Sequence, residues 1–144
     1  MKVLFDTSVL VAALVEAHPM HQRALPWMQR AKAGEITMVV ASHSVAKLYA
    51  VLTALPVQPR ITAALAWQLI HENIARAATV IALSWGDYRA VIKQLSGSGV
   101  VGGITYDALI ARAAQKARAT RLITLNPGDF ERVWPEGRHV IATP

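Results

Sequence analysis

The sequence predicts an α/β domain in which a mainly parallel central sheet is covered by helices on both faces. Short β-branched, apolar stretches alternate along the chain with longer stretches whose apolar residues recur at helical spacing. The chain has 144 residues and is 53% hydrophobic, which suits one domain with a real core. Neither an internal repeat nor a low-complexity segment divides it, so we expect a single domain over residues 1–144.

Five stretches have the composition of short buried strands. They are rich in valine, isoleucine and leucine, and glycine, proline or polar residues bound them. Because helices separate them along the chain, neighbouring strands are expected to run parallel. The predicted strands cover residues 2–5, 36–41, 79–83, 121–125 and 140–141.

The stretches between the strands have the spacing and end signals of helices. Ser42 and Ser84 are suited to cap the helices that follow them, and Gly34 is suited to end another. The glycines and serines of residues 96–103 predict a flexible loop. The predicted helices cover residues 7–15, 20–33, 43–53, 61–75, 85–95 and 104–118.

Composition narrows the functional classes. The net charge is +6, which favours a polyanionic partner such as nucleic acid and is equally compatible with simple solubility. The chain has no cysteine, which excludes disulfides and thiolate metal sites and makes a reducing cytoplasm the expected location. No apolar run reaches the roughly 18 residues of a membrane span, so we expect no membrane association.

Three acidic residues fall at places where α/β folds build sites. Asp6 ends the first predicted strand, and Asp129 lies on the turn after the fourth, at the edge where ligands bind. Asp107 lies in the first turn of a helix, where the helix dipole favours a carboxylate. Clustered carboxylates repel one another unless a cation neutralises them, and oxygen ligands suit Mg²⁺ or Mn²⁺. We therefore predict that the three aspartates form one divalent-metal site.

Each aspartate also has an ordinary structural interpretation. Asp107 suits a helix start, Asp129 suits a turn, and Asp6 suits the cap of the helix that begins at Thr7. Asp6 is the hardest to explain in this way because it interrupts an apolar stretch. The chain has only nine acidic residues, so three at such positions favour a shared site.

The segments that carry these acids resemble, in order, motifs of PIN-domain ribonucleases, specifically the VapC-type toxins of VapBC toxin–antitoxin pairs. They are residues 3–10 (VLFDTSVL), 102–111 (GGITYDALIA) and 122–130 (LITLNPGDF). The resemblance runs nearly end to end and implies a PIN-like, three-layer fold. It also implies that Asp6, Asp107 and Asp129 hold one or two Mg²⁺ or Mn²⁺ ions, which activate water for attack on an RNA phosphodiester.

The resemblance implies supporting residues and partners as well. Thr7 or Ser8 would orient a carboxylate or a bound water, and Asn126 would do so near Asp129, although Thr7 and Asn126 equally suit ordinary helix-start roles. The expected partners are the RNA substrate, a second copy in a homodimer and a small VapB-type antitoxin. The antitoxin's C-terminal segment would cover the acidic site and present an arginine to it.

One position departs from the family pattern. The family has a glutamate on the helix after the second strand, and the matching position in the segment 42–53 (SHSVAKLYAVLT) holds Lys47. At ~5 Å and an effective dielectric of ~20, an ammonium and a divalent ion repel by roughly 6 kcal/mol, an upper-end value. We therefore predict weak metal binding and little or no nuclease activity. Lys47 is also suited to pair with the aspartates in the metal's place, or to be a solvated helix residue.

Lys47 also supports an alternative of another class, a non-catalytic module that binds RNA or only its antitoxin. Restoring a glutamate at this position discriminates between them, since a pure binder would stay inactive. Other features gave weaker signals: His18 and His21 are interpreted as surface residues, and His43 as isolated. The basic residues interpreted either as an RNA guide or as an ordinary solvated face are Arg23, Arg30, Lys32, Arg112, Lys116 and Arg118.

Overall fold

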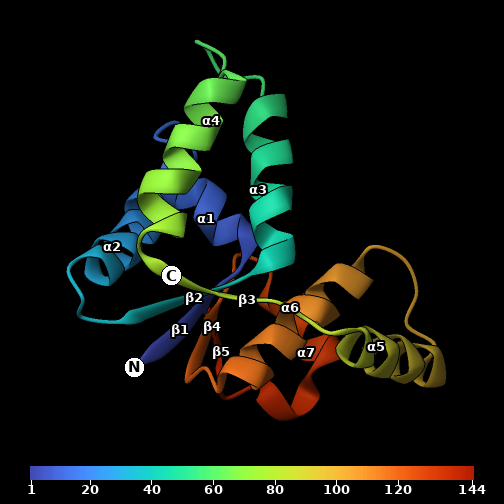
Figure 1. The fold of residues 1–144 in the computed structure, drawn as a ribbon. Helices are drawn as coiled ribbons and strands as arrows, with labels where there is room; N and C mark the ends of the chain where they lie inside the picture. Colours follow the sequence, from blue (N-terminus) through green and yellow to red (C-terminus); the bar gives the residue numbers. More distant parts are fainter.

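The computed structural model describes all 144 residues and contains one five-stranded sheet, in which every pair of neighbouring strands is parallel (Figure 1). The strand order is β3-β2-β1-β4-β5, as expected for strands joined by helices. The predicted fold class is confirmed, although the third and fourth strands end two residues earlier than expected. The strands are β1 (Lys2–Phe5), β2 (Thr37–Ala41), β3 (Ala78–Ile81), β4 (Arg121–Ile123) and β5 (Ile141–Ala142).

Seven α-helices connect or flank the strands, and none combines the length and apolar character needed to cross a membrane. Two local predictions were wrong. Ser42 is the first residue of its helix and makes no cap bond, and residues 96–98 continue a helix that ends at Gly99, whose φ is +68°. The helices are α1 (Thr7–Leu14), α2 (His21–Lys32), α3 (Ser42–Ala54), α4 (Ala63–Ile70, extended by the π-helical turn His71–Ala75), α5 (Trp85–Ser98), α6 (Ile104–Ala117) and α7 (Pro127–Val133, followed by the 3₁₀ turn Pro135–Gly137).

The helices form two layers, one on each face of the sheet. Successive strand residues point to opposite faces, so Phe5 joins the core under α1–α4 while its neighbour Leu4 joins the core under α5–α7. Figure 1 shows α3 and α4 side by side, extending away from the sheet, with α5, α6 and α7 on the other side. The sheet is therefore buried between two cores, which explains why its central strands are almost wholly apolar.

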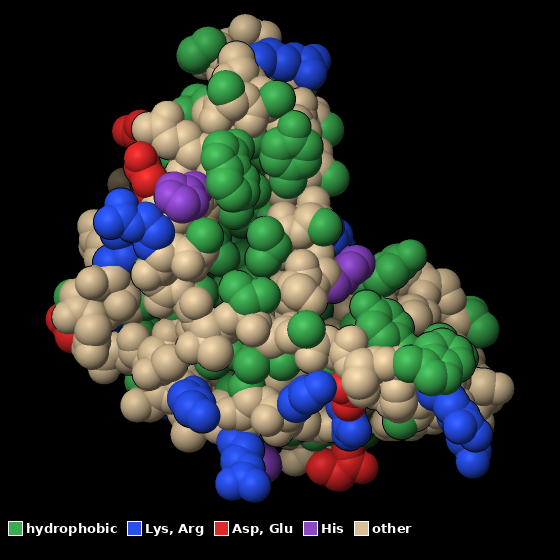
Figure 2. All heavy atoms as spheres, in the orientation of Figure 1, with side chains coloured by type: hydrophobic (Ala, Val, Ile, Leu, Met, Phe, Trp, Pro, Cys, Tyr) green, Lys and Arg blue, Asp and Glu red, His purple; other side chains and the backbone are tan.

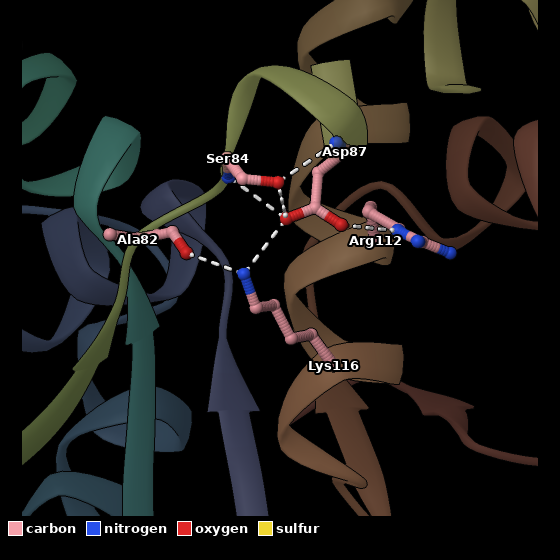
Figure 3. Close-up of polar contacts among 5 residues, drawn as sticks. All are labelled: Ala82, Ser84, Asp87, Arg112 and Lys116. Atoms are coloured by element: carbon pink, nitrogen blue, oxygen red, sulfur yellow. Dashed lines mark hydrogen bonds and ion pairs between the residues drawn. The ribbon is translucent and has the colours of Figure 1, made fainter. Parts of the chain in front are cut away.

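An ionic network fixes α5 against α6 (Figure 3). Ser84 and Asp87 form a capping box at the start of α5, and the Asp87 carboxylate accepts from Arg112 Nε at 3.0 Å and from Lys116 Nζ at 2.8 Å. Lys116 also donates to the Ala82 carbonyl at 3.1 Å. The hydrogen bond from Lys116 is the main cause that lowers the pKa of Asp87. Two of the six basic residues considered as an RNA guide are therefore engaged in holding helices together.

Candidate functional site

The site lies where the strand order diverges, between β1 and β4. From β1 the chain continues to β2 and β3 on one side, and β4 and β5 lie on the other. Parallel strands end at the same edge, so the residues that follow β1, β2 and β4 come together there, as is usual for sites of open α/β sheets. The backbone N–H of Asp6 donates to the Ile123 carbonyl at 3.0 Å, which fixes Asp6 beside the end of β4.

Asp6 is buried and its carboxylate is held by three donors. Its Oδ1 accepts from the backbone N–H of Thr7 at 2.7 Å. Its Oδ2 accepts from the hydroxyls of Ser8 at 2.6 Å and Thr124 at 2.8 Å. Asp6 is thus the N-cap of α1, as its ordinary interpretation required. A carboxylate offers about four lone-pair directions, so one remains for a further partner.

The polar residues near Asp6 contribute unequally. The Ser8 hydroxyl also accepts from the Leu125 N–H at 3.1 Å, and Ser8 therefore links α1 to the segment after β4. Thr7 contributes its backbone N–H, whereas its hydroxyl is buried without a partner. Asn126 is the N-cap residue of α7 but makes no side-chain cap bond.

Sequence reasoning did not select Thr124, a fully buried residue that holds both Asp6 and the Asn126 N–H. The signal for Thr124 was a polar side chain just after a strand that pairs with β1.

A cavity of about 320 Å³ opens beside Asp6. Asp107, from the first turn of α6, and Lys47, from α3, line the same cavity, so the topology brings together residues more than 100 positions apart. Asp129 is exposed on the first turn of α7 and does not line it. The lining residues are Asp6, Thr7, Ser8, Val11, His18, Lys47, Val51, Leu55, Asp107 and Asn126.

The electrostatics of Asp107 show that negative charge gathers here. Burial and, to a smaller extent, the charges of Asp6 and Asp129 together raise the pKa of Asp107 to about 6, while Lys47 acts in the opposite direction. Asp129 therefore lies near enough to act on Asp107 although it lies outside the cavity. The three predicted aspartates share one electrostatic environment.

Lys47 is exposed at the cavity and pairs with neither neighbouring aspartate. The four ion pairs of the molecule lie elsewhere, so the prediction that Lys47 pairs with the aspartates in the metal's place is wrong in this structure. Its charge still acts at a distance, since it lowers the pKa of both Asp107 and His43. For His43 burial is the larger cause.

The aspartates match a divalent cation in chemistry but only partly in arrangement. Oxygen ligands and crowded negative charge suit Mg²⁺ or Mn²⁺. However, no group of three or more His, Asp or Glu side chains lies in a geometry that holds a metal ion. Lys47 adds a positive charge at the same cavity. The chemistry of these side chains therefore suits such an ion, but their arrangement does not form a complete binding site.

His18, which was predicted to be a surface residue, lines the cavity. Its Nδ1 accepts from the Met20 N–H at 3.0 Å, so its other nitrogen carries the proton when the ring is neutral. The Nδ1 of His21, in contrast, bonds the Ala12 carbonyl at 2.9 Å. The two histidines therefore support different local structures and do not bind a common partner.

Comparison with known proteins identifies related chains. A family model described as PIN domain matches residues 3–134. Ribonuclease VapC40 of Mycobacterium tuberculosis is 33% identical over 121 residues, covering 83% of this chain and 82% of the relative. Ribonuclease VapC27 of the same organism is 33% identical over 114 residues, covering 79% and 77%.

Solved structures share the fold at low identity. VapBC2 from Rickettsia felis, bound to a DNA fragment from its promoter, gives a TM-score of 0.67 at 19% identity and covers 100% of this chain and 99% of that one. Mycobacterium tuberculosis VapC20, a Sarcin-Ricin loop cleaving toxin, gives a TM-score of 0.64 at 14% identity, covering 83% and 86%. Both are similar in architecture to this chain.

Proposed function

Because the chain belongs to the PIN-domain family, we propose that it is a metal-dependent endoribonuclease toxin of a toxin–antitoxin pair, weakened by Lys47. The observation that carries the proposal is that Asp6, Asp107 and Lys47 line one cavity at the carboxyl edge of the sheet. Its relatives of 33% identity are ribonucleases, which supports RNA as the substrate. The net charge of +6 suits such a polyanion.

Each residue has a proposed role. Asp6, Asp107 and Asp129 would hold Mg²⁺ or Mn²⁺, which when bound supplies an activated water and stabilises charge on the phosphate. Ser8 and Thr124 hold the Asp6 carboxylate in one orientation. Asn126 faces the cavity and is available to position water or RNA.

Lys47 weakens the site through charge. Three carboxylates attract a divalent ion strongly, whereas an ammonium beside them lowers the negative potential of the cavity and supplies no ligand to the ion. A lysine side chain is flexible and moves away at some cost, so the site retains a low affinity. In this proposal the chain keeps the fold of its family but has an incomplete set of metal-binding side chains.

RNA cleavage by matched variants tests the proposal. The parent chain, Lys47→Glu and Lys47→Gln would be incubated with RNA and Mn²⁺, with EDTA controls. We expect Lys47→Glu to cleave at least tenfold faster than the parent, and a Lys47→Glu, Asp107→Asn double variant to lose that gain. Cleavage by the parent at a rate equal to Lys47→Glu would contradict the role of Lys47.

A binding module without catalysis is the second candidate, and Lys47 is the observation that favours it. An ammonium at the cavity suits a phosphate group or an acidic side chain better than it suits a metal ion. In this case Lys47→Glu would weaken RNA binding and no variant would cleave. The same set of variants therefore separates the two functions.

An apolar groove supports the proposed antitoxin partner. A hollow of about 470 Å³ lies between the end of α1 and α4, and hydrophobic residues such as Leu14, Ile61 and Leu69 line it. The acidic cavity also runs along α1 and the end of α3, through Val11 and Leu55. A single antitoxin segment would then cover both hollows. Leu65 of α4 also lines the apolar groove. We expect Leu65→Asp to weaken binding of the antitoxin, measured by calorimetry, and Ile92→Asp, an exposed position on α5, to leave it unchanged.

The proposed homodimer has a suitable face over α3, α4 and the sheet edge. Figure 2 shows hydrophobic side chains gathered over α3 and α4, and Trp67 is 59% exposed there. Trp67 and Val80 line an apolar hollow of about 280 Å³ that has no charged residue, so a second copy meets it without charge repulsion. We expect Trp67→Glu to yield monomers in analytical ultracentrifugation. A dimer that survives this change uses another face.

A further inference from the structure

Two aromatic rings lie stacked beside the acidic cavity. His43, in the first turn of α3, and Tyr106, in the first turn of α6, have ring centroids 5.0 Å apart and planes within 6° of parallel. Parallel rings at this centroid distance are offset, the arrangement that aromatic pairs prefer. Tyr106 is 49% exposed, so much of its surface remains open beside the stack.

The stack adjoins the proposed catalytic residues on both helices. Tyr106 precedes Asp107 on α6. His43 lies four residues before Lys47 on α3, so both point from the same side of that helix. One turn of helix spans about 5–6 Å, which is comparable to the separation between the base and the phosphate of a nucleotide. Neither ring lines the cavity itself, but the stack lies one helical turn from Lys47 and next in sequence to Asp107, which do line it.

Packing between α3 and α6 is the simpler explanation for the two rings, and two details do not fit it. An aromatic ring that serves only packing gains most when it is buried, yet half of Tyr106 is exposed. The Nε2 atom of His43 is buried without a hydrogen-bond partner, a cost that an apolar side chain would avoid. A ring that is stacked on a neighbouring ring and still half exposed suits a ligand instead.

We propose that Tyr106, backed by His43, is a stacking platform for one base of single-stranded RNA next to the proposed site of cleavage. Every base has an aromatic face, so such a platform binds RNA with little sequence preference. Proteins commonly read unpaired RNA by stacking bases on exposed aromatic side chains. A stacking platform implies that the RNA bound at the site is unpaired. This proposal rests on the nuclease function proposed above.

A binding measurement in EDTA tests the platform apart from catalysis. Short single-stranded RNAs carrying one 2-aminopurine would be titrated with the parent chain, Tyr106→Ala, Tyr106→Phe and, as a control, Trp85→Ala. Trp85 is 74% exposed on α5 and lies outside the site. We expect quenching of 2-aminopurine by the parent and by Tyr106→Phe. Tyr106→Ala should bind about five- to a hundredfold more weakly, and Trp85→Ala should bind as the parent does.

The outcomes separate the platform from the nuclease function. Equal affinity and quenching for Tyr106→Ala and the parent would overturn the platform, and cleavage by Lys47→Glu would still stand. Absence of RNA binding by the parent would overturn the platform as well. His43→Leu is the companion variant: if it retains the parent's melting temperature and loses quenching, the backing ring positions Tyr106. If His43→Leu binds and quenches like the parent, the proposed backing by His43 is wrong.

Discussion

The hydroxyl of Thr124 donates to the Asp6 carboxylate at 2.8 Å, joining the segment after β4 to the end of β1. Both residues are buried, and the same hydroxyl accepts from the Asn126 N–H at 3.0 Å. The position of the proposed catalytic acid is therefore set by the pairing of two strands that are more than 100 residues apart in the sequence.

The first prediction follows from this bond. Thr124→Val removes a donor from Asp6 and an acceptor from Asn126, which should lower the free energy of unfolding by about 1–3 kcal/mol. Thr120→Val is a matched control at the other end of β4, where the hydroxyl donates to the Lys2 carbonyl from an exposed position. Urea denaturation measures both. If both variants lost the same free energy of unfolding, the buried hydrogen bond of Thr124 would stabilise the fold no more than the exposed one of Thr120.

The second prediction concerns Asp107, whose pKa is raised from 3.8 to about 6. The folded state therefore holds the proton more tightly than the unfolded state, and stability falls as pH rises from about 4 through 6. Asp107→Asn has no charge at any pH, so it should be more stable than the parent at pH 7.5. The gain should be at most roughly 3 kcal/mol, and smaller if solvent screens the charge.

Denaturation in EDTA at pH 3.5 and pH 7.5 checks this pH dependence. At pH 3.5 the parent's Asp107 is mostly protonated in both states, so most of the advantage of Asp107→Asn should disappear there. An equal advantage at both pH values would contradict the electrostatic cause. Lys47→Gln should raise the pKa of Asp107 further, since Lys47 lowers it, and carbon-13 NMR of the carboxyl group measures that change.

The third prediction concerns the network on Asp87, whose pKa is lowered chiefly by Lys116. A lowered pKa means that the network stabilises the fold above pH 3.8 and that this stabilisation is lost as pH falls below that value. Asp87→Asn should lower the melting temperature at pH 7, and Lys116→Met should lower it more than Arg112→Met. Glu131→Gln, which removes an ion pair with the exposed Arg138, is the control and should change little.

Most of the fold was predictable from the sequence because its signals are local. Apolar stretches of strand length alternate in the sequence with stretches of helical spacing, and this pattern predicted the parallel sheet. Ser84 was correctly predicted to cap α5. One helix was missed, since the segment after β4 was predicted as a turn and forms α7 (Pro127–Val133). The other errors fell at element ends. Ser42 entered α3 itself, and residues 96–98 stayed helical because Gly99 rather than Gly97 adopts the left-handed conformation that ends α5.

The site was less predictable because its geometry depends on tertiary contacts. Asp6, Asp107 and Lys47 were selected from sequence and do line one cavity, whereas Asp129 lies outside it. Thr124 had only the weak signal of a polar side chain after a strand, and no local pattern marks the His43–Tyr106 stack. The contacts of both form only when distant segments meet. The metal preference and the effect of Lys47 on activity stay predictions.

Isothermal titration with Mn²⁺ tests the central claim, that Lys47 is what weakens an otherwise suitable acidic site. The parent chain, Lys47→Gln and Lys47→Glu would be titrated at pH 7.5 in parallel. Removing the ammonium should strengthen Mn²⁺ binding, and adding the carboxylate should strengthen it further, so that affinity rises in the order Lys, Gln, Glu with at least a tenfold gain for Glu. If all three chains bind Mn²⁺ equally, or if none binds it, Lys47 does not control a metal site and the account is contradicted.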